Sequence, residues 1–313
     1  MTWHTVVDKP CALGESPFWH PDEQMLYWVD IPGQQVHRLN VFMGSVDSWA
    51  MPSEPGCIAP ARDAHGESAG LVIALRDGIY RARDWGGDLR LLAPALHDPA
   101  NSRFNDGKAD PAGRFWAGTL YEPRNAALAK LFSLDCRNSL ATGRIPALEV
   151  KAEGATTSNG LAWSPDAKTL YWSDTPSHTI RAWDWDIDGN TLGGERIFKQ
   201  WPLKPAGWQS GMPGYSGRPD GAAVDVQGNY YVAMFEGACV LKLSPQGEVL
   251  AEIGTPALCP TMPCFGGTDM HTLYLTTARQ NRPDAELQRY PESGCVFAMQ
   301  MDVPGLAVNF FAD

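Results

Sequence analysis

The segment TTSNGLAWSPDAKTLYWSDT, residues 156–175, determines the fold assignment because its pattern occurs again elsewhere in the chain. Its second half has the bulky residues of a β-strand, and the SPDAKT before that strand is a turn. Its first half opens with Asn159-Gly160, a pair typical of turns, although the residues that follow are apolar and suited to burial. A strand, a tight turn and a second strand together predict a β-hairpin.

This hairpin is found six times. The copy that begins at Glu15, ESPFWHPDEQMLYWVD, matches the copy from Asn159, and shorter copies begin at Asn105 and Asp220. Two weaker copies begin near residues 56 and 262. Each copy is followed by enough strand-like sequence for two more strands. An all-β repeat of this length predicts a propeller, here a single domain over residues 1–313 with six blades of four antiparallel strands.

The propeller assignment leads to further expectations about individual segments and residues. Residues 3–7 (WHTVV) are expected to pair with residues 294–302, so that an N-terminal strand closes the ring. Five of the twelve tryptophans hold repeat positions and are expected to pack between blades, with sugar stacking as the alternative: Trp19, Trp28, Trp116, Trp163 and Trp172. Asp30 and Asp174 end equivalent strands, so a structural role in the repeat is expected for both.

The composition limits the classes of function that the protein can have. The net charge is −11 and the chain has no run of Lys or Arg, which argues against a nucleic-acid partner. No apolar stretch approaches the roughly 18 residues that span a membrane, and the N-terminus does not resemble a signal peptide, so a cytoplasmic protein without membrane contact is expected. The seven cysteines include no CxxC pair and are expected to be reduced and buried. A monomer or a small homo-oligomer is expected.

Four hairpins begin with an oxygen-bearing side chain at the same place in the repeat: Glu15, Asn105, Asn159 and Asp220. The first strand of each blade lines the propeller axis, so these side chains are expected to converge at one end of the central tunnel. Two carboxylates in a partly desolvated cavity repel each other unless a cation neutralises them. Oxygen ligands suit a hard divalent cation such as Ca²⁺, Mg²⁺ or Mn²⁺. The alternative is that Asn-Gly and Asp-Gly are turn residues only.

Five motifs resemble those of the SMP-30/gluconolactonase/regucalcin family of six-bladed propeller lactonases: LGESPFW (13–19), RFNDGKADPAGRFWAGT (103–119), SNGLAWSPD (158–166), RPDGAAVD (218–225) and PCFGG (263–267). The resemblance implies that Glu15, Asn159 and Asp220 bind one divalent metal ion. It also implies that Arg103 and Asn105 contact the substrate; whether Asn105 contacts the metal, the substrate or a bridging water stays open. Ca²⁺ is the expected ion, with Zn²⁺, Mn²⁺, Mg²⁺ and Fe²⁺ as alternatives.

Two features depart from the family pattern. Family members often have an acidic substrate contact just after the AGT motif, and in AGTLYEPRN the candidate for this contact is Glu122. The segment before RPDG, residues 199–218, is long and rich in Gly, Pro and aromatic residues. It is expected to be either a lid over the tunnel mouth or an excursion on the surface.

The activity that the resemblance implies is hydrolysis of a sugar (aldono) lactone to the sugar acid. The metal would polarise the lactone carbonyl, water would attack it, and Asp220 would be both a ligand and the candidate general base. The alternatives are a metal-dependent phosphotriesterase or aryl esterase, and a non-enzymatic calcium-binding propeller. The sequence contains neither a GxSxG nucleophile elbow nor an HExxH zinc motif.

Overall fold

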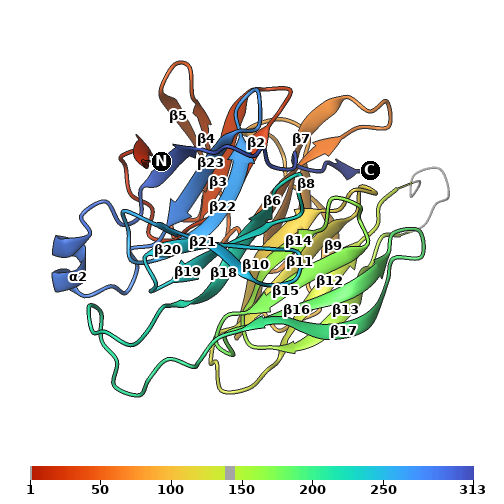
Figure 1. Cartoon of the computed structure of the whole chain (residues 1–313). Helices are drawn as coiled ribbons and strands as arrows, with labels where there is room; N and C mark the ends of the chain where they lie inside the picture. Colours follow the sequence, from red (N-terminus) through yellow and green to blue (C-terminus); the bar gives the residue numbers. More distant parts are fainter. Residues whose placement is uncertain (1, 138–144) are drawn as a thin grey trace.

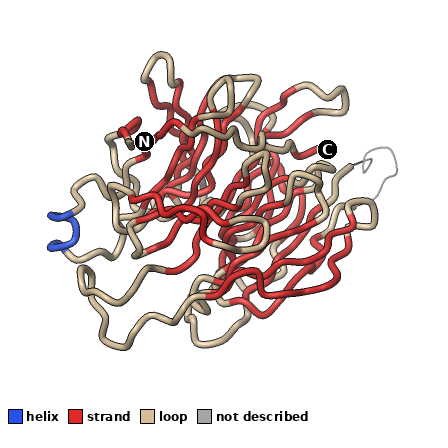
Figure 2. Tube along the Cα trace, in the orientation of Figure 1, coloured by secondary structure: helices blue, strands red, loops and turns tan. Residues whose placement is uncertain are grey.

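The computed structural model describes residues 2–137 and 145–313, which lie mostly in strands and in the turns between them (Figure 1, Figure 2). The strands form six sheets, five of four strands and one of five. Each innermost strand contacts the innermost strands of the neighbouring blades, and the last of them, β22, contacts the first, β2. The six-bladed β-propeller predicted from the repeat is therefore confirmed.

In five blades the four main strands run from the axis outward in chain order, and in the sixth the outermost strand is the N-terminal β1. The innermost strands are β2 (Gly14–His20), β6 (Cys57–Arg62), β10 (Ser102–Ala109), β14 (Ser158–Trp163), β18 (Arg218–Val224) and β22 (Pro260–Gly266). The second strands are β3 (Met25–Asp30), β7 (Ser68–Leu75), β11 (Phe115–Tyr121), β15 (Thr169–Asp174), β19 (Tyr230–Phe235) and β23 (Thr272–Thr277). The third strands are β4 (Gln35–Asn40), β8 (Gly78–Ala82), β12 (Ala129–Leu134), β16 (Thr179–Asp186), β20 (Cys239–Leu243) and β24 (Val296–Gln300). The outermost strands are β5 (Ser45–Ala50), β9 (Arg90–Pro94), β13 (Leu148–Ala155), β17 (Thr191–Gln200), β21 (Val249–Gly254) and β1 (His4–Val7).

The ring is closed by strands from both ends of the chain. β1 pairs antiparallel with β24 and completes the sixth blade, as the sequence predicts. The C-terminal strand β25 (Phe311–Ala312) pairs parallel with β6 and gives the second blade its fifth strand. β25 was not predicted from the sequence, because a pair of two-residue segments carries no periodic pattern.

The tryptophans of the repeat pack between blades, as predicted. Trp28, Trp116 and Trp172 are fully buried. Trp116 in the third blade meets Trp163 in the fourth, with ring centroids 5.8 Å apart in an edge-to-face arrangement. Trp19 in the first blade stacks on Tyr274 in the sixth at 5.9 Å. These contacts join neighbouring blades, and edge-to-face or offset pairs of aromatic rings contribute more than their buried area alone.

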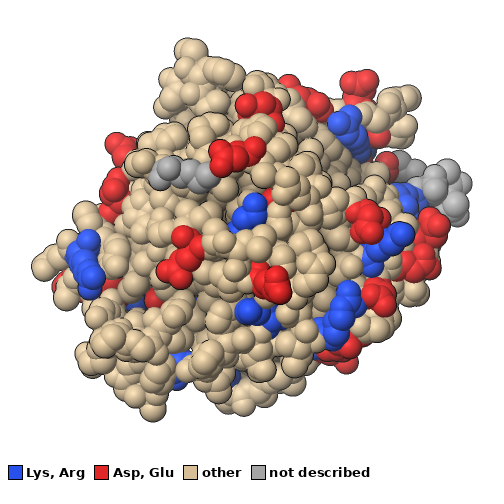
Figure 3. Space-filling model, viewed as in Figure 1, with Lys and Arg blue, Asp and Glu red and all other residues tan. Residues whose placement is uncertain are grey.

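The structure also confirms the predicted state of the cysteines. All seven are buried and free. One short helix, α2 (Asp284–Arg289), lies at the edge of the molecule (Figure 1). Over the described ranges, no helix has both the length and the apolar character that crossing a membrane would require. Acidic and basic side chains are interspersed over the face of the molecule that Figure 3 shows.

The carboxylates that end β3 and β15 hold the start of the innermost strands. Asp174 accepts hydrogen bonds from the backbone N–H groups of Thr156 and Thr157, at 2.9 and 3.0 Å. Asp30 makes the same pair of bonds to residues 12 and 13, at 2.9 and 3.1 Å. In both blades the bonded residues directly precede the innermost strand that carries a predicted metal ligand. The structural role predicted for both carboxylates is confirmed.

We expect Asp174→Ala to destabilise the protein. The substitution leaves the N–H groups of Thr156 and Thr157 without their acceptor, and a buried polar group without a partner costs about 1–3 kcal/mol. Thermal and urea unfolding measure the loss. The control is Asp166→Ala, which removes a carboxylate from an exposed turn and should change the free energy of unfolding by less than about 0.5 kcal/mol. Equal losses in the two variants would contradict the structural role.

Candidate functional site

The innermost strands surround a cavity of about 320 Å³ at the end of the axis where they begin. Five blades contribute to its wall. Its polar lining residues are Glu15, Arg103, Asn105, Arg124, Thr157, Asn159, Thr175, Arg218, Asp220, Gln280, Asn281 and Arg282. All predicted metal and substrate residues except Glu122 are in this set.

A β-bulge lies at the polar residue of each contributing innermost strand. The pairing register shifts between Glu15 and Phe18, between Phe104 and Gly107, between Asn159 and Ala162, and between Pro219 and Ala222. A bulge breaks the strict alternation of a strand and turns a side chain to a new direction. These shifts therefore provide a local reason why polar side chains of four blades face a common cavity.

Gly160 permits the bulge in the fourth blade. Its φ of 60° lies in the left-handed region, which glycine adopts at no steric cost. A Cβ atom at this position would collide with the hydroxyl groups of Ser173 and Tyr230. The Asn159-Gly160 pair thus combines a candidate ligand with a backbone that must approach its neighbours closely, which is why a turn-like dipeptide opens a buried strand.

The two predicted carboxylate ligands are buried and have no ion-pair partner among the described residues. Glu15 is 4% exposed and Asp220 is 6% exposed, and neither forms an ion pair within the described part of the chain. Burial, and then the negative charges of Asp220 and Asp106, raise the pKa of Glu15 well above its usual value. Burial and then the charge of Asp106 raise the pKa of Asp220 to about 8. Buried carboxylates in this condition are stable only when protonated or when a cation is bound.

Asp106 is a third carboxylate near the axis, and the repeat pattern of the sequence did not reveal it. It is 3% exposed, and its Oδ2 accepts a hydrogen bond from the Leu161 N–H at 2.9 Å. Its Oδ1 has no hydrogen-bond partner among the described residues. Burial raises its pKa, and the charge of Lys108 opposes that shift. The residue directly follows Asn105 in RFNDGK, so its place in the motif was the available signal.

A chain of hydrogen bonds links the amides of the site across three blades. Arg103 Nη1 donates to Asn105 Oδ1 at 2.7 Å, and Asn105 Nδ2 donates to Asn159 Oδ1 at 2.8 Å. Asn159 Nδ2 donates to Thr175 Oγ1 at 2.8 Å, which in turn donates to the Pro219 carbonyl at 2.7 Å. The oxygen of Asn105 is therefore engaged by a guanidinium. A cation at that oxygen would be repelled by Arg103, so the geometry favours Asn105 as a support for Asn159.

The donor set fits a hard cation. Across residues 2–137 and 145–313, no group of three or more His, Cys, Asp and Glu side chains is arranged to hold a metal ion. An ion in this cavity would be held by the carboxylates of Glu15 and Asp220 together with the amide oxygen of Asn159. Such a set contains oxygen alone and has two negative charges, which suits Ca²⁺ or another hard divalent cation.

Glu122 lies outside the cavity wall. Its carboxylate forms an ion pair with Arg76 at 2.9 Å, and the same guanidinium also binds Glu54. The hydrogen bond from Arg76 lowers the pKa of Glu122. Whether Glu122 reaches a substrate stays a prediction. The residue that lines the cavity from this loop is Arg124, two positions further on.

The long segment before RPDG flanks the cavity. Within residues 199–218, Arg218 is the one residue that lines it. Lys204 forms an ion pair with Glu236 at 2.8 Å, and the hydroxyl of Tyr215 lies 2.9 Å from Nε2 of His178. The segment projects on the side of the molecule that carries α2 (Figure 1). Its role as a lid stays a prediction.

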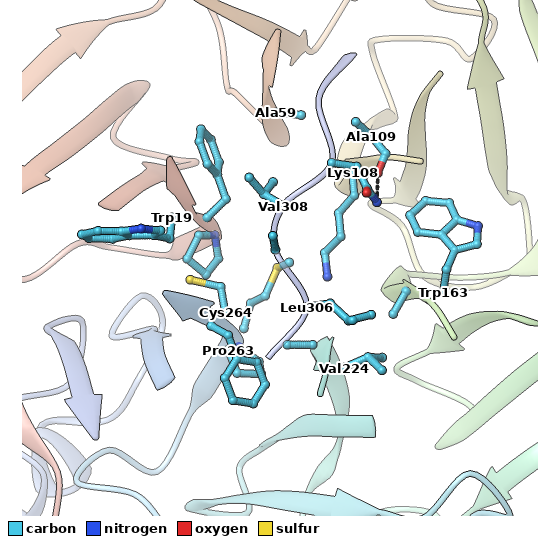
Figure 4. Close-up of a pocket in the computed structure, with 18 of the residues that line it drawn as sticks. Trp19, Ala59, Lys108, Ala109, Trp163, Val224, Pro263, Cys264, Leu306 and Val308 are labelled. Carbon is cyan, nitrogen blue, oxygen red and sulfur yellow. Dashed lines mark hydrogen bonds between the residues drawn. The ribbon is translucent and has the colours of Figure 1, made fainter. Parts of the chain in front are cut away.

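A second cavity, of about 280 Å³, lies toward the opposite end of the axis (Figure 4). Residues of all six innermost strands line it, and the C-terminal segment that contains Leu306 and Val308 crosses it. Lys108 extends into it and donates a hydrogen bond to the Ala222 carbonyl at 2.5 Å. Its described lining is mostly apolar and contains no carboxylate. The cavity around Glu15 and Asp220 is therefore the better candidate for metal-dependent chemistry.

We expect metal-free protein to lose stability as the pH rises. The folded-state pKa of Asp220 is raised to about 8, so the folded protein holds this proton more tightly than the unfolded chain does. The resulting stability is fully present below about pH 4 and is lost as the pH rises towards 8. In chelator, the melting temperature should fall more steeply between pH 5 and 8 for the wild type than for Asp220→Asn. Asp166→Asn, at an exposed turn, is the control and should follow the wild type. Parallel curves for the wild type and Asp220→Asn would show that the Asp220 pKa is not raised.

Known proteins resemble this chain over nearly its whole length. The family model described as SMP-30/Gluconolactonase/LRE-like region matches residues 13–279. A 6-deoxy-6-sulfogluconolactonase of Pseudomonas putida is 42% identical over 311 residues, which cover 99% of each chain. A pentonolactonase of Haloferax volcanii is 34% identical and covers 89% of this chain and 86% of its own. Regucalcin of Danio rerio is 32% identical, with coverage of 97% and 94%.

Solved structures share the same architecture. A calcium-binding protein, regucalcin from Agrobacterium tumefaciens, superimposes with a TM-score of 0.85 at 22% identity, covering 99% of this chain and 97% of its own. A luciferin-regenerating enzyme gives a TM-score of 0.85 at 24% identity, covering 100% and 99%. At these identities the superpositions support the propeller fold alone.

Proposed function

The chain belongs to the SMP-30/gluconolactonase family, and from that premise we propose that it hydrolyses a sugar lactone to the sugar acid with the help of one divalent metal ion. A lactone is an internal carboxylic ester, so the chain is a hydrolase of ester bonds. Full-length relatives are named as lactonases for sulfogluconolactone and pentonolactone. The names of these relatives therefore agree with the proposed activity, the hydrolysis of an aldonolactone.

One observation carries the metal-dependent part of the proposal. Glu15 and Asp220 are buried in the same cavity and neither forms an ion pair among the described residues, and burial and neighbouring negative charges raise the pKa of both carboxyl groups. A divalent ion bound to both would remove that repulsion. The side-chain amide of Asn159 lies in the same cavity, where its oxygen accepts a hydrogen bond from Asn105 and its nitrogen donates one to Thr175. These three residues are the proposed ligands, with Ca²⁺ as the expected ion.

The cavity suits a sugar better than an aryl ester. Its volume of about 320 Å³ is at the lower end of the range for small-molecule sites. Most of its lining residues carry hydrogen-bonding groups, including Gln280 and Asn281 from the sixth blade. A sugar lactone presents a hydroxyl on nearly every carbon and requires such partners, whereas an aryl ester requires an apolar wall. This lining disfavours the phosphotriesterase or aryl esterase alternative.

The residues of the chain would divide the remaining tasks. When bound, the ion would supply Lewis-acid polarisation of the lactone carbonyl. Arg103 uses Nη1 within the protein, which leaves its other N–H groups for the ring oxygen and hydroxyls of the substrate. Its pKa is lowered by burial to about 10, so the guanidinium remains charged at neutral pH. Asp220 would accept the proton of the attacking water as the candidate general base.

Hydrolysis of a panel of aldonolactones tests the function. Purified protein is incubated with each lactone, and acid release is followed with and without a chelator. We expect release that exceeds the spontaneous rate, that stops with chelator, and that returns when a divalent ion is added back. The absence of catalysed release from every lactone, with metal present, would contradict the proposal. Release that is indifferent to chelator would contradict its metal-dependent part.

Asp220→Asn separates the two roles proposed for Asp220. The substitution keeps an oxygen ligand but removes a negative charge, so metal affinity should fall, and excess metal should restore occupancy. Activity at full occupancy should remain lower by about 10²–10⁴-fold, the usual contribution of a general base. Metal titration followed by calorimetry and by lactone hydrolysis measures both quantities, with Asp166→Asn as the surface control. Full activity at full occupancy would show that Asp220 is a ligand only.

A further inference from the structure

Positive charge is concentrated at the candidate site of an otherwise acidic protein. Four arginines line the cavity: Arg103, Arg124, Arg218 and Arg282. They face two lining carboxylates, Glu15 and Asp220, whereas the chain as a whole has a net charge of −11. A divalent ion held by these two carboxylates would neutralise both of them. The arginines would then have no lining carboxylate left to balance their charge, and only the partners outside the cavity wall would remain.

Two of the four arginines form hydrogen bonds inside the protein, Arg282 through its whole guanidinium and Arg103 through Nη1. Arg282 forms a two-pronged ion pair with Glu286, at 2.8 and 2.6 Å, and a further one with Glu236 at 3.1 Å. Arg103 donates to the Phe104 carbonyl and to Asn105, as part of the amide network. The charges with the fewest commitments are therefore those of Arg218 and Arg124.

Arg218 is compensated only in part. The nearest carboxylate to its guanidinium is Glu236, at 3.5 Å. That carboxylate is already bound more closely by Lys204 at 2.8 Å and by Arg282 at 3.1 Å. One negative charge is thus shared by three cations. The guanidinium of Arg218 also lies over the ring of Phe235, 5.2 Å from its centroid, which holds it beside the cavity.

The guanidinium of Arg124 has no partner among the described residues. It is exposed at the rim of the cavity and forms neither a side-chain hydrogen bond nor an ion pair in that part of the chain. Its backbone has a φ of 54°, a region that residues other than glycine seldom adopt.

The two guanidiniums lie close enough to repel each other. Partial desolvation, and then the charge of Arg218, lower the pKa of Arg124. Both charges also act on Asp220, where they oppose the rise in pKa that burial causes. Arg124 and Arg218 therefore share the side of the cavity next to Asp220. Two neighbouring guanidiniums that repel each other form a site that an oxyanion would stabilise, through paired N–H donors and opposite charge.

We propose that Arg124 and Arg218 bind an anionic group of the substrate, a sulfonate or a phosphate, on the terminal carbon of the sugar chain, which is the opposite end of the chain from the lactone carbonyl carbon. The inference rests on the proposed lactonase function and names its substrate class, an aldonolactone with a strongly acidic terminal group. Sulfonate and phosphate share three terminal oxygens and negative charge, so both match a pair of guanidiniums. Arg124, whose side chain makes no bond within the described protein, is free to bind such a group in full.

A different role for these arginines has a different consequence. They could instead stabilise the oxyanion that forms at the lactone carbonyl, or the carboxylate of the product. Both of those charges arise with every lactone, whether or not it carries a terminal acid. In that case the loss of Arg124 would reduce the hydrolysis of neutral and anionic lactones by the same factor.

The experiment compares three substrates with the metal-loaded enzyme: glucono-1,5-lactone, its 6-phosphate and its 6-deoxy-6-sulfonate. We expect kcat/KM of the wild type to be at least about tenfold higher for one of the anionic lactones than for the neutral one. Arg124→Gln should reduce this ratio by about tenfold or more, mainly through KM, and Arg124→Lys should restore part of it. Arg196→Gln, on β17 outside the cavity, is the control and should leave all three values unchanged. The better of the two anionic substrates identifies the group that the subsite prefers.

Binding of the product acids provides a readout without turnover. Calorimetry should show that wild-type protein binds 6-phosphogluconate or 6-deoxy-6-sulfogluconate more tightly than gluconate, and that Arg124→Gln removes the difference. Hydrolysis of the neutral lactone as fast as or faster than both anionic ones, or an equal loss on all three in Arg124→Gln, would overturn the inference while the lactonase function stands. No hydrolysis of any of the three would overturn both.

Discussion

Repulsion between carboxylates buried near the propeller axis is the constraint on which the rest of the site depends. Glu15, Asp106 and Asp220 come from three blades. Burial raises the pKa of all three, and the charge of Asp106 further raises the pKa of Glu15 and of Asp220. A protein interior does not tolerate such a group of like charges without protons, a cation or both. The hydrogen-bonded amides beside them and the divalent ion that we propose are both consequences of this constraint.

The propeller provides a scaffold stiff enough to hold such a group together. Tryptophan pairs between blades and the pairing of β1 with β24 close the ring, so the innermost strands cannot move apart without losing buried aromatic contacts. The carboxylates of Asp30 and Asp174 fix the backbone just before the strands that carry Glu15 and Asn159. Bulges then turn the polar side chains toward the cavity. The regular strands set where each side chain lies, and the bulges set the direction in which it points.

Negatively and positively charged side chains occupy different parts of the site. The carboxylates lie near the axis, Arg103 and the amides lie beside them, and Arg124 and Arg218 lie next to Asp220. Under our proposal, the lactone ester would lie at the metal ion and the terminal acid of the substrate would bind Arg124 and Arg218. This arrangement links the position of catalysis to the recognition of one end of the substrate, as expected for an enzyme that must distinguish among similar sugars.

The order of amino acids was enough to predict the architecture and the candidate ligand positions. A hairpin with the same tryptophans and the same polar first residue occurs in register along the chain, and equivalent positions of a propeller repeat must face the same point on the axis. This equivalence alone brings Glu15, Asn159 and Asp220 together. It does not predict that Arg124 and Arg218 line one cavity, because Arg124 lies in a loop outside the repeat whereas Arg218 begins the innermost strand β18 of another blade. Asp106 also escaped prediction, because a bulge, and not strand alternation, decides where that side chain points. A periodic pattern predicts only the features that each repeat shares. The charge of the cavity depends on distances between residues about a hundred positions apart in the sequence, and those distances are set only when the chain folds.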